Sequence, residues 1–450
     1  MTGRELILQT YRHERTSRVP WVPFTGVHAG KLKGYNAREV LTDEEKLFTS
    51  LMEVHKLYMP DGMPIIFDLQ LEAEILGCEL LWAENNPPSV MTHPLEQDDA
   101  VDGKLIETTD KRIPMVMNVC RRVKAAIGDS TALYGLLCGP FTLASHLRGT
   151  KLFLDMKRNP QRVHDLMEYA FQNACRMVDL YAEVGMDVVA PVDPLVSQIS
   201  PAHFRTFLSD VYTRLLGYIR AKGLCSSFFV CGNALRNIEE MCLTKPDGIS
   251  IDENIPMAQA KEITDRYNVA IGGNIPLTTT MLFGTQQDNM KFVVDMLDSV
   301  DGHNLIVSPG CDMPYDTPIE NTIAVAETVR DVEKYRELVK NYESVGTDVA
   351  VELPDYGALN KPLLEAFTLD SASCAACAYM WAMVREAEEH FHGQIDVVEY
   401  KYTSKEGIAR CKRMEVKNLP SLYINGQLAY ASIIPSHEEL YDQVEHLLGR

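Results

Sequence analysis

The sequence contains eight short apolar runs that are continuous rather than alternating, and this pattern limits the fold more than any other feature. The runs are VPWVPFTG (19–26), MPIIFDL (63–69), ALYGLLC (132–138), MDVVAPVD (186–193), SSFFVCG (226–232), DGISID (247–252), NVAIGG (268–273) and NLIVSPGC (304–311). Such runs are typical of strands buried on both faces of a parallel sheet. Amphipathic segments between them, such as residues 159–185 and 257–267, predict the connecting helices. We therefore expect an α/β fold, a (β/α)8 TIM barrel over residues 1–340, with a doubly wound sheet as the alternative.

The pattern changes after residue 340, which predicts a second domain. Residues 341–360 show no clear period and are interpreted as a linker. Residues 361–450 alternate predicted strands and helices, and Asn425-Gly426 marks the turn of a hairpin. A smaller α/β domain is expected there.

Composition and charge exclude several classes of partner. The net charge of −20 argues against nucleic acid, because binding phosphates requires a basic face. No run of 18 apolar residues and no signal-peptide pattern occurs, so we expect a cytoplasmic protein without a membrane partner. The eleven scattered cysteines are typical of reduced thiols rather than of a disulfide framework.

Polar residues end most of the predicted strands, where a barrel of this kind places its chemistry. They are His28, Asp68, Cys138, Asp193, Cys231, Asp252, Asn274 and Cys311. From these strand ends and the turns beside them, we predict catalytic roles for Asp193, Asp252 and Asn233. His28 and Asn274 are predicted to bind a cofactor.

Cys231 and Cys311 are the most specific pair among these residues. Each follows an apolar strand inside a glycine-containing turn, VCGN or SPGCDMP. Two thiolates and one further ligand make an open zinc site whose fourth position takes substrate or water. The alternative is that two of the eleven cysteines simply fall at strand ends as small apolar residues.

Several motifs in the first 335 residues resemble the uroporphyrinogen decarboxylase superfamily, and more closely its cobalamin-linked methyltransferase branch. They are FDLQLEAEILGCE (67–79), GPFTLASHLRGT (139–150), DPLVSQISPAHFRTFLSDVY (193–212), VCGNALRNIEEM (230–241), ISIDENIP (249–256), IGGNIP (271–276), FGT (283–285) and SPGCDMPYDTPIENT (308–322). The resemblance implies a (β/α)8 barrel with a central funnel. The decarboxylases carry an arginine-rich loop after the first strand, whereas FTGVHAGKLKG (24–34) has no arginine. A decarboxylase-like lyase therefore remains only as an alternative.

The resemblance also implies a metal site, from which this chain departs at one position. In the thiol-methylating members a His-x-Cys motif and a later cysteine hold zinc. Cys231 and Cys311 match the two cysteines, but Phe229 occupies the histidine position and cannot bind a metal. The third ligand must then come from another strand end. Glu74 is our first choice, and the other candidates are Asp193, His28 and Cys138.

The implied reaction moves a methyl group between a corrinoid and a small molecule. Zinc would either lower the pKa of a bound thiol or polarise the oxygen of a methoxy group. The substrate is therefore expected to be a thiol or a methoxy or methylthio compound. The chain has no DxHxxG-type corrinoid-binding sequence, so cobalamin is expected to arrive on a separate corrinoid protein or as a free cofactor.

The second domain resembles the thioredoxin fold in two features. Cys374 and Cys377 form a C-x-x-C pair at a predicted strand-to-helix turn, and Pro420 precedes the next strand. The start of a helix stabilises a thiolate, so Cys374 would be the attacking sulfur, and Pro420 would be a cis-proline facing it. The alternatives for this pair are a docking role or metal binding. A redox or binding adaptor that acts through this domain is the remaining alternative function.

Overall fold

The computed structural model describes residues 1–97, 103–344, 349–372 and 375–449, and the chain forms two units. The first unit is Met1–Ser344 and the second is Val345–Arg450. Residues 349–360, expected to be a linker, pack within the second unit. The Tyr356 hydroxyl donates a hydrogen bond to Glu365 (2.8 Å), and the Arg410 guanidinium donates one to the carbonyl of Glu352 (2.8 Å).

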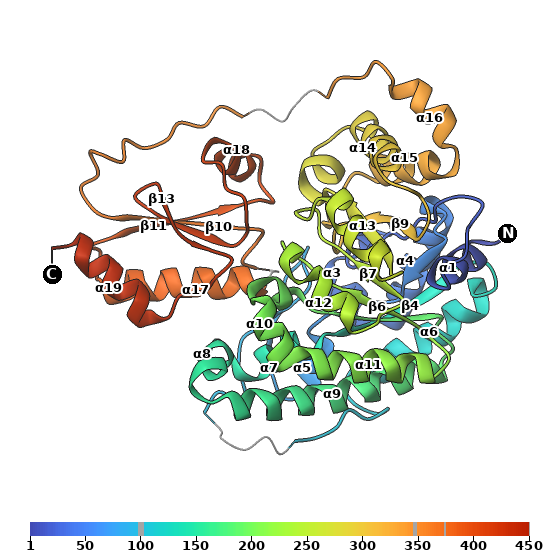
Figure 1. The fold of residues 1–450 in the computed structure, drawn as a ribbon, viewed down its shortest axis with the longest axis horizontal. Coiled ribbons are helices and arrows are strands. Elements are labelled where there is room, and N and C mark those ends of the chain that lie inside the picture. The colour runs from blue at the N-terminus through green and yellow to red at the C-terminus, as the bar shows by residue number, and fades with distance from the viewer. Residues whose placement is uncertain (98–102, 345–348, 373–374, 450) are drawn as a thin grey trace. The chain divides into compact units, whose positions relative to one another are not determined.

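The first unit contains, among the described residues, a seven-stranded parallel sheet whose strands follow one another in chain order (Figure 1). They are β1 (Gly62–Pro64), β4 (Ala132–Cys138), β5 (Val188–Val192), β6 (Cys225–Phe229), β7 (Gly248–Ser250), β8 (Ala270–Ile275) and β9 (Leu305–Pro309). Residues 20–22 fill the remaining position: the Val22 N–H donates to Val307 of β9 (3.0 Å), and the Asp61 N–H donates to Trp21 (2.9 Å). This segment closes the sheet between β9 and β1, and the predicted barrel is confirmed.

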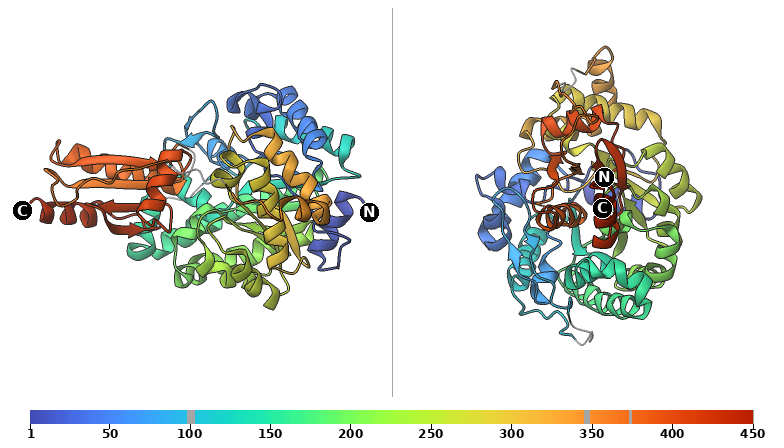
Figure 2. Two further views of the ribbon diagram at one scale, coloured as in Figure 1. Left: turned by 90° about the horizontal axis from the view of Figure 1, so that it is seen from above. Right: turned by 90° about the vertical axis from the view of Figure 1, so that its left-hand side faces the viewer.

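Helices cover the outside of the strands of the first unit (Figures 1 and 2). They include α1 (Gly3–Tyr11), α2 (His28–Lys31), α3 (Ala37–Thr42), α4 (Glu44–Tyr58), α5 (Leu71–Ile75), α6 (Ile113–Ile127), α7 (Pro140–Arg148), α8 (Lys151–Arg158), α9 (Pro160–Glu183), α10 (Pro201–His203), α11 (Ser209–Ala221), α12 (Ile238–Leu243), α13 (Met257–Arg266), α14 (Gln286–Ser299), α15 (Ile319–Arg330) and α16 (Val332–Val339). The longest, α9, begins because the Asn159 side chain accepts from the N–H of Arg162 and Pro160 occupies the first position. None of the helices among the described residues combines the length and the apolar character that crossing a bilayer requires.

The segment that interrupts the strand–helix alternation after β1 forms a small substructure. Helix α5 is followed by the antiparallel pair β2 (Leu80–Leu81) and β3 (Ser89–Val90). The sequence predicts an excursion of short strands or loop over residues 71–115. The described residues show the two short strands and loop, but helix α5 opens the range and the first residues of α6 close it.

The second unit contains, in its described part, a four-stranded sheet in the order β11-β10-β12-β13. Its elements are β10 (Leu363–Thr368), α17 (Ala375–His390), β11 (Asp396–Lys401), α18 (Lys405–Arg413), β12 (Ser421–Ile424), β13 (Gln427–Ala431) and α19 (His437–Leu447). Strands β10 and β11 are parallel and β12 is antiparallel to β10. Helices α17 and α19 cover one face and α18 the other (Figure 1). Asn425 and Gly426 both have positive φ (49° and 77°), as the predicted hairpin turn requires.

Candidate active site

Two glycine turns carry the cysteines at the carboxyl ends of β6 and β9. Gly232, directly after Cys231, has a φ of 78°, which favours glycine. Gly310, directly before Cys311, leaves no room for a side chain, because a Cβ there would lie 2.6 Å from the backbone nitrogen of Glu253. Both turns thus contain a glycine that no other residue could replace without strain.

The fold brings Cys231 and Cys311 together although 80 positions separate them. Both are free cysteines, and their sulfur atoms lie close enough to bond directly. Both side chains are partly exposed and pack against the apolar core of the barrel. The two thiols therefore form one site at the mouth of the barrel.

Phenyl rings form the apolar surface against which the cysteines pack. Phe229, at the position where the resemblance leads us to expect histidine, is 1% exposed. Its ring centroid lies 4.8 Å from that of Phe24 and 5.7 Å from that of Phe67. A polar ring at position 229 would be buried among these groups, so the packing favours phenylalanine there.

Glu74 lies in an ion pair with Arg112. Its carboxylate accepts from the Arg112 Nε (2.9 Å), and the same guanidinium donates to Asp68 (2.6 Å). Across the described residues, no group of three or more histidine, cysteine, aspartate or glutamate side chains is arranged to hold a metal ion. The structure thus brings together the two predicted thiol ligands but not Glu74.

His28 and Cys138 occupy buried positions. The Nδ1 of His28 lies 2.9 Å from the carbonyl of Tyr315, so Nδ1 carries the proton, and Nε2 accepts from the Tyr58 hydroxyl (2.7 Å). Burial lowers the pKa of His28 to about 4, which keeps the ring neutral. Burial also raises the pKa of Cys138 well above its ordinary value. Both ring nitrogens of His28 are therefore hydrogen-bonded in this arrangement.

Asp193 anchors the start of helix α7. Its carboxylate accepts from the N–H groups of Phe141 (2.9 Å) and Thr142 (3.1 Å), from the Thr142 hydroxyl (2.6 Å) and from the Tyr212 hydroxyl. Burial raises the pKa of Asp193 to about 6, and these donors oppose that rise. With so many donors on the carboxylate, the observed contacts assign it to holding α7.

Asp252, two residues after β7, contacts the turn that carries Cys231. Its carboxylate accepts from the N–H of Gly232 and from the N–H of Asn254 (2.8 Å). Asn274 donates to the carbonyls of Asp252 (3.0 Å) and Ile255 (2.6 Å), so it holds the same loop rather than facing open space. The predicted Asn233 accepts from the N–H of Leu235 (3.4 Å) in the turn after Cys231.

Sequence reasoning missed three carboxyl groups near the predicted site. Glu253 accepts from the N–H of Leu277, and burial together with the charge of Asp252 raises its pKa to about 8. Asp312, next to Cys311, has one oxygen that is buried without a protein partner. Glu72, not Glu74, is the buried acid of LEAE, and it accepts from the N–H of Cys138 (2.9 Å). For Glu253 and Asp312, the position directly beside a strand-end residue was the available signal.

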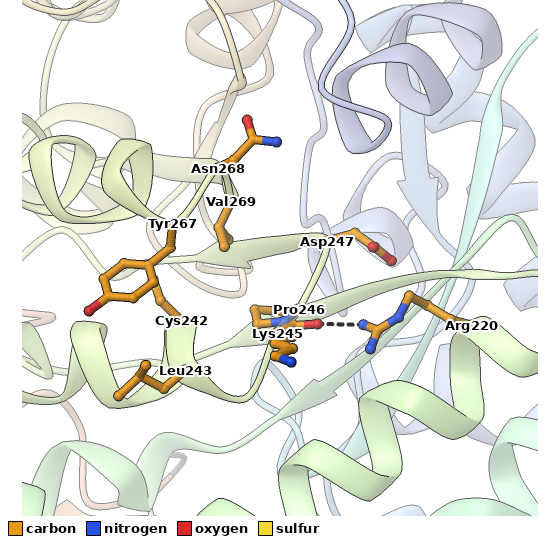
Figure 3. A pocket seen from close by; sticks show the side chains of 9 residues that line it. All are labelled: Arg220, Cys242, Leu243, Lys245, Pro246, Asp247, Tyr267, Asn268 and Val269. Carbon is orange, nitrogen blue, oxygen red and sulfur yellow. Dashed lines mark hydrogen bonds between the residues drawn. The ribbon is translucent and has the colours of Figure 1, made fainter.

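A cavity of about 490 Å³ lies at the opposite rim of the first unit (Figure 3). It is lined by residues that precede β7 and β8, including Asp247 and Val269. The Arg220 guanidinium in its wall donates to the carbonyl of Lys245. None of the predicted site residues is among the residues that line this cavity.

The predicted redox residues belong to the second unit. Cys374 lies outside the described residues. Cys377 is buried in the first turn of α17, and its sulfur accepts from the N–H of Leu369 (3.2 Å). The Leu419–Pro420 peptide bond is cis, as the sequence predicts. The thioredoxin-like character of this unit stays a prediction.

Comparison with known proteins places the first unit in a family. The family model described as uroporphyrinogen decarboxylase (URO-D) matches residues 2–332. The methylcobamide:CoM methyltransferase MtbA of Methanosarcina acetivorans is 24% identical over 349 residues, 76% of this chain and 98% of that protein. The uroporphyrinogen decarboxylase of Parasynechococcus marenigrum is 23% identical over 290 residues, 62% of this chain and 81% of that protein.

A solved structure shows the same fold. The methyltransferase from Methanosarcina mazei superposes with a TM-score of 0.68 at 23% identity and covers 74% of this chain and 99% of its own. The predicted superfamily and the resemblance to its methyltransferase branch are confirmed. The chain belongs to the uroporphyrinogen decarboxylase (URO-D) family.

Proposed function

We propose that this chain is a corrinoid-dependent methyltransferase that moves a methyl group between a corrinoid and a small thiol or a methylthio or methoxy compound. The observation that carries the proposal is the pairing of Cys231 and Cys311 at the mouth of the barrel. Relatives named methylcobamide:CoM methyltransferases support methyl transfer to sulfur as the reaction class. The chain has no corrinoid-binding sequence of the DxHxxG type, so the corrinoid is proposed to come from a separate protein or from solution.

In the part of the chain that the structure describes, the cysteine pair does not form a complete zinc site. A catalytic zinc site normally has three protein ligands and one open position. The described residues supply two thiols at this site and no third histidine, cysteine, aspartate or glutamate. The residues present therefore do not fit a complete zinc centre, and the proposed reaction involves no zinc.

The residues around the pair can bind and orient a small methylated molecule. The phenyl rings of Phe24, Phe67 and Phe229 give an apolar surface for a methyl group and exclude water beneath the thiols. Asp252 and Glu253 fix the two cysteine turns. The corrinoid would supply or accept the methyl group.

Methylation of a thiol releases a proton, and we propose that Glu253 accepts it. Its backbone touches Gly310, next to Cys311, and its pKa of about 8 suits proton transfer near neutral pH. In the balanced reaction the sulfur would gain the methyl group and lose its proton to Glu253, and the two electrons of the broken bond would stay with the bound corrinoid.

The proposal is tested by following methylcobalamin absorbance with the full-length protein. One arm supplies thiols as methyl acceptors, and the other supplies methylthio and methoxy donors to reduced cobalamin. We expect turnover in at least one arm and its loss in Cys231→Ser and Cys311→Ser, with Cys225→Ser as the control. Absence of turnover in both arms, or release of CO2 from uroporphyrinogen instead, contradicts the proposal.

The redox-adaptor alternative makes the opposite prediction for the same variants. It requires that Cys374→Ser abolish activity while both barrel cysteines are dispensable. Methyl transfer that survives Cys374→Ser excludes it.

A further inference from the structure

Cys231 and Cys311 differ from the other described cysteines of the first unit because they combine partial exposure with pairing. Cys120 and Cys242 are buried, and burial raises the pKa of each to about 12. Cys225 is partly exposed, but burial of its thiol raises its pKa to about 12 as well. The mouth pair is partly exposed, with each sulfur within bonding reach of the other.

The two turns that carry the pair are held by one short loop. Asp252 accepts from the N–H of Gly232, and the backbone of Glu253 lies against Gly310. Neither cysteine sits on a long flexible loop, because each follows a buried strand by two residues. The approach of the two sulfurs is therefore built into the barrel and needs no rearrangement.

We propose that Cys231 and Cys311 are a redox-active dithiol that exchanges with small-molecule disulfides, and that its oxidation switches methyl transfer off. The dithiol exchange stands on the geometry alone, whereas the switching of methyl transfer rests on the proposed function. The missing third metal ligand agrees with the proposal, since the described residues leave both sulfurs available.

The exchange is balanced in two steps. The thiolate of one cysteine attacks a sulfur of the small disulfide, the disulfide bond breaks, and one small thiol leaves with a proton. The second cysteine then attacks the mixed disulfide, the Cys231–Cys311 bond forms, and the second small thiol leaves. The pair loses two electrons and two protons, and the small disulfide gains them.

The chemical class of the oxidant matches the proposed methyl acceptor. A small thiol that accepts methyl groups becomes a small disulfide under oxidising conditions. A dithiol at the mouth of the site would then sense the oxidised form of the enzyme's own substrate class and stop turnover when that pool is oxidised.

The test uses the full-length, chelator-treated protein with glutathione disulfide as the probe. After alkylation and digestion, mass spectrometry should find the Cys231 and Cys311 peptides linked to each other, and dithiothreitol should separate them. Cys311→Ser should instead stop at a mixed disulfide on Cys231 that carries one glutathione. Cys225→Ser is the matched control and should form the linked peptide as the unaltered chain does. No linked peptide at excess glutathione disulfide, or a linkage that persists in Cys311→Ser, overturns the dithiol.

The switch is tested separately from the proposed function. Oxidised protein should lose at least ten-fold in methyl transfer and recover after dithiothreitol, whereas unchanged activity overturns the switch. A reversible linked peptide in a protein that never transfers methyl groups would leave the dithiol intact, and only the proposed function would fail.

Discussion

The carboxylate of Asp252 accepts a hydrogen bond from the backbone N–H of Gly232, and this contact ties the end of β7 to the turn that presents Cys231. The Asp252 side chain is buried and also accepts from Asn254 (2.8 Å). The position of the Cys231 turn therefore depends on the Asp252 carboxylate.

Asp252→Ala should loosen the Cys231 turn and destabilise the first unit. Removing a buried acceptor leaves N–H groups unpaired, which costs about 1–3 kcal/mol. Asp295→Ala, which breaks a surface pair with Lys291 on α14, should cost less than about 0.5 kcal/mol. Urea unfolding followed by circular dichroism measures both, and equal losses would contradict this role.

Glu253→Gln should remove a limb from the pH profile of thiol methylation. The raised pKa means that Glu253 holds its proton up to about pH 8, so its capacity to accept a proton grows as the pH rises through that value. The substrate thiol titrates in the same range. The effect of Glu253 is therefore read from the difference between the pH profiles of the two variants. Glu262→Gln, at an exposed position of α13, is the control. Identical profiles for the two variants would exclude Glu253 as the proton acceptor.

Arg112→Ala should be strongly destabilising. Arg112 neutralises Asp68, whose side chain is fully buried, at 2.6 Å. Leaving a buried charge without its partner costs about 3–5 kcal/mol. Arg121→Ala, on the same helix but in an exposed pair with Glu183, should cost less than about 1 kcal/mol. A similar unfolding midpoint for the two variants would show that the buried pair does not contribute as proposed.

His28 should make the stability of the first unit depend on pH. Its pKa is about 4 in the folded protein against an ordinary 6.5, so the stabilisation is complete above pH 6.5 and is lost as the pH falls toward 4. The total change is up to about 3 kcal/mol. His28→Gln should flatten this dependence, whereas His437→Gln, on the second unit, should leave it unchanged. Unfolding curves at pH 4.5, 5.5 and 7 distinguish these results.

Phe229→His should increase zinc binding. The unaltered chain supplies two thiols among the described residues, so we expect less than one zinc per chain after dialysis. A histidine at position 229 would point into the barrel beside Cys231 and raise the zinc content towards one per chain. Phe228→His is the control, because Phe228 stacks on Tyr212 at 4.0 Å and not on the rings around Phe229. One tightly bound zinc in the unaltered chain would contradict this prediction, because it would require a third ligand besides Cys231 and Cys311.

Much of the fold could be predicted from the pattern of apolar residues. The eight runs and the helices between them specify a parallel barrel, since strands buried on both faces need no polar side. The roles of the strand-end residues could not be predicted in the same way. Asp193 and His28 were candidates for catalysis and cofactor binding, but their side chains are bonded to neighbouring elements. A strand-end position places a residue at the mouth, whereas its contacts depend on the next loop.

The segment LEAE (71–74) shows that contacts of single residues, too, could not be predicted from the sequence. Glu72 and Glu74 are two positions apart in a short helix, and the sequence does not say which faces the strands. The structure buries Glu72 against Cys138 and pairs Glu74 with Arg112. Arg112 lies 38 positions from Glu74, so the pairing depends on how α6 packs.

The sequence alone determined the barrel, the division into two units and the two cysteines at strand ends, because periodicity and glycine turns are local properties. Only the tertiary structure decided that the sulfurs of Cys231 and Cys311 meet and that Glu74 does not join them. Those facts depend on how the barrel curves through β7 and β8 between β6 and β9, and on ion pairs between distant segments, which local sequence does not encode. Among the described residues, the two sulfurs lie side by side next to the loop of Asp252 and Glu253, and no third histidine, cysteine, aspartate or glutamate joins them in a metal-binding arrangement.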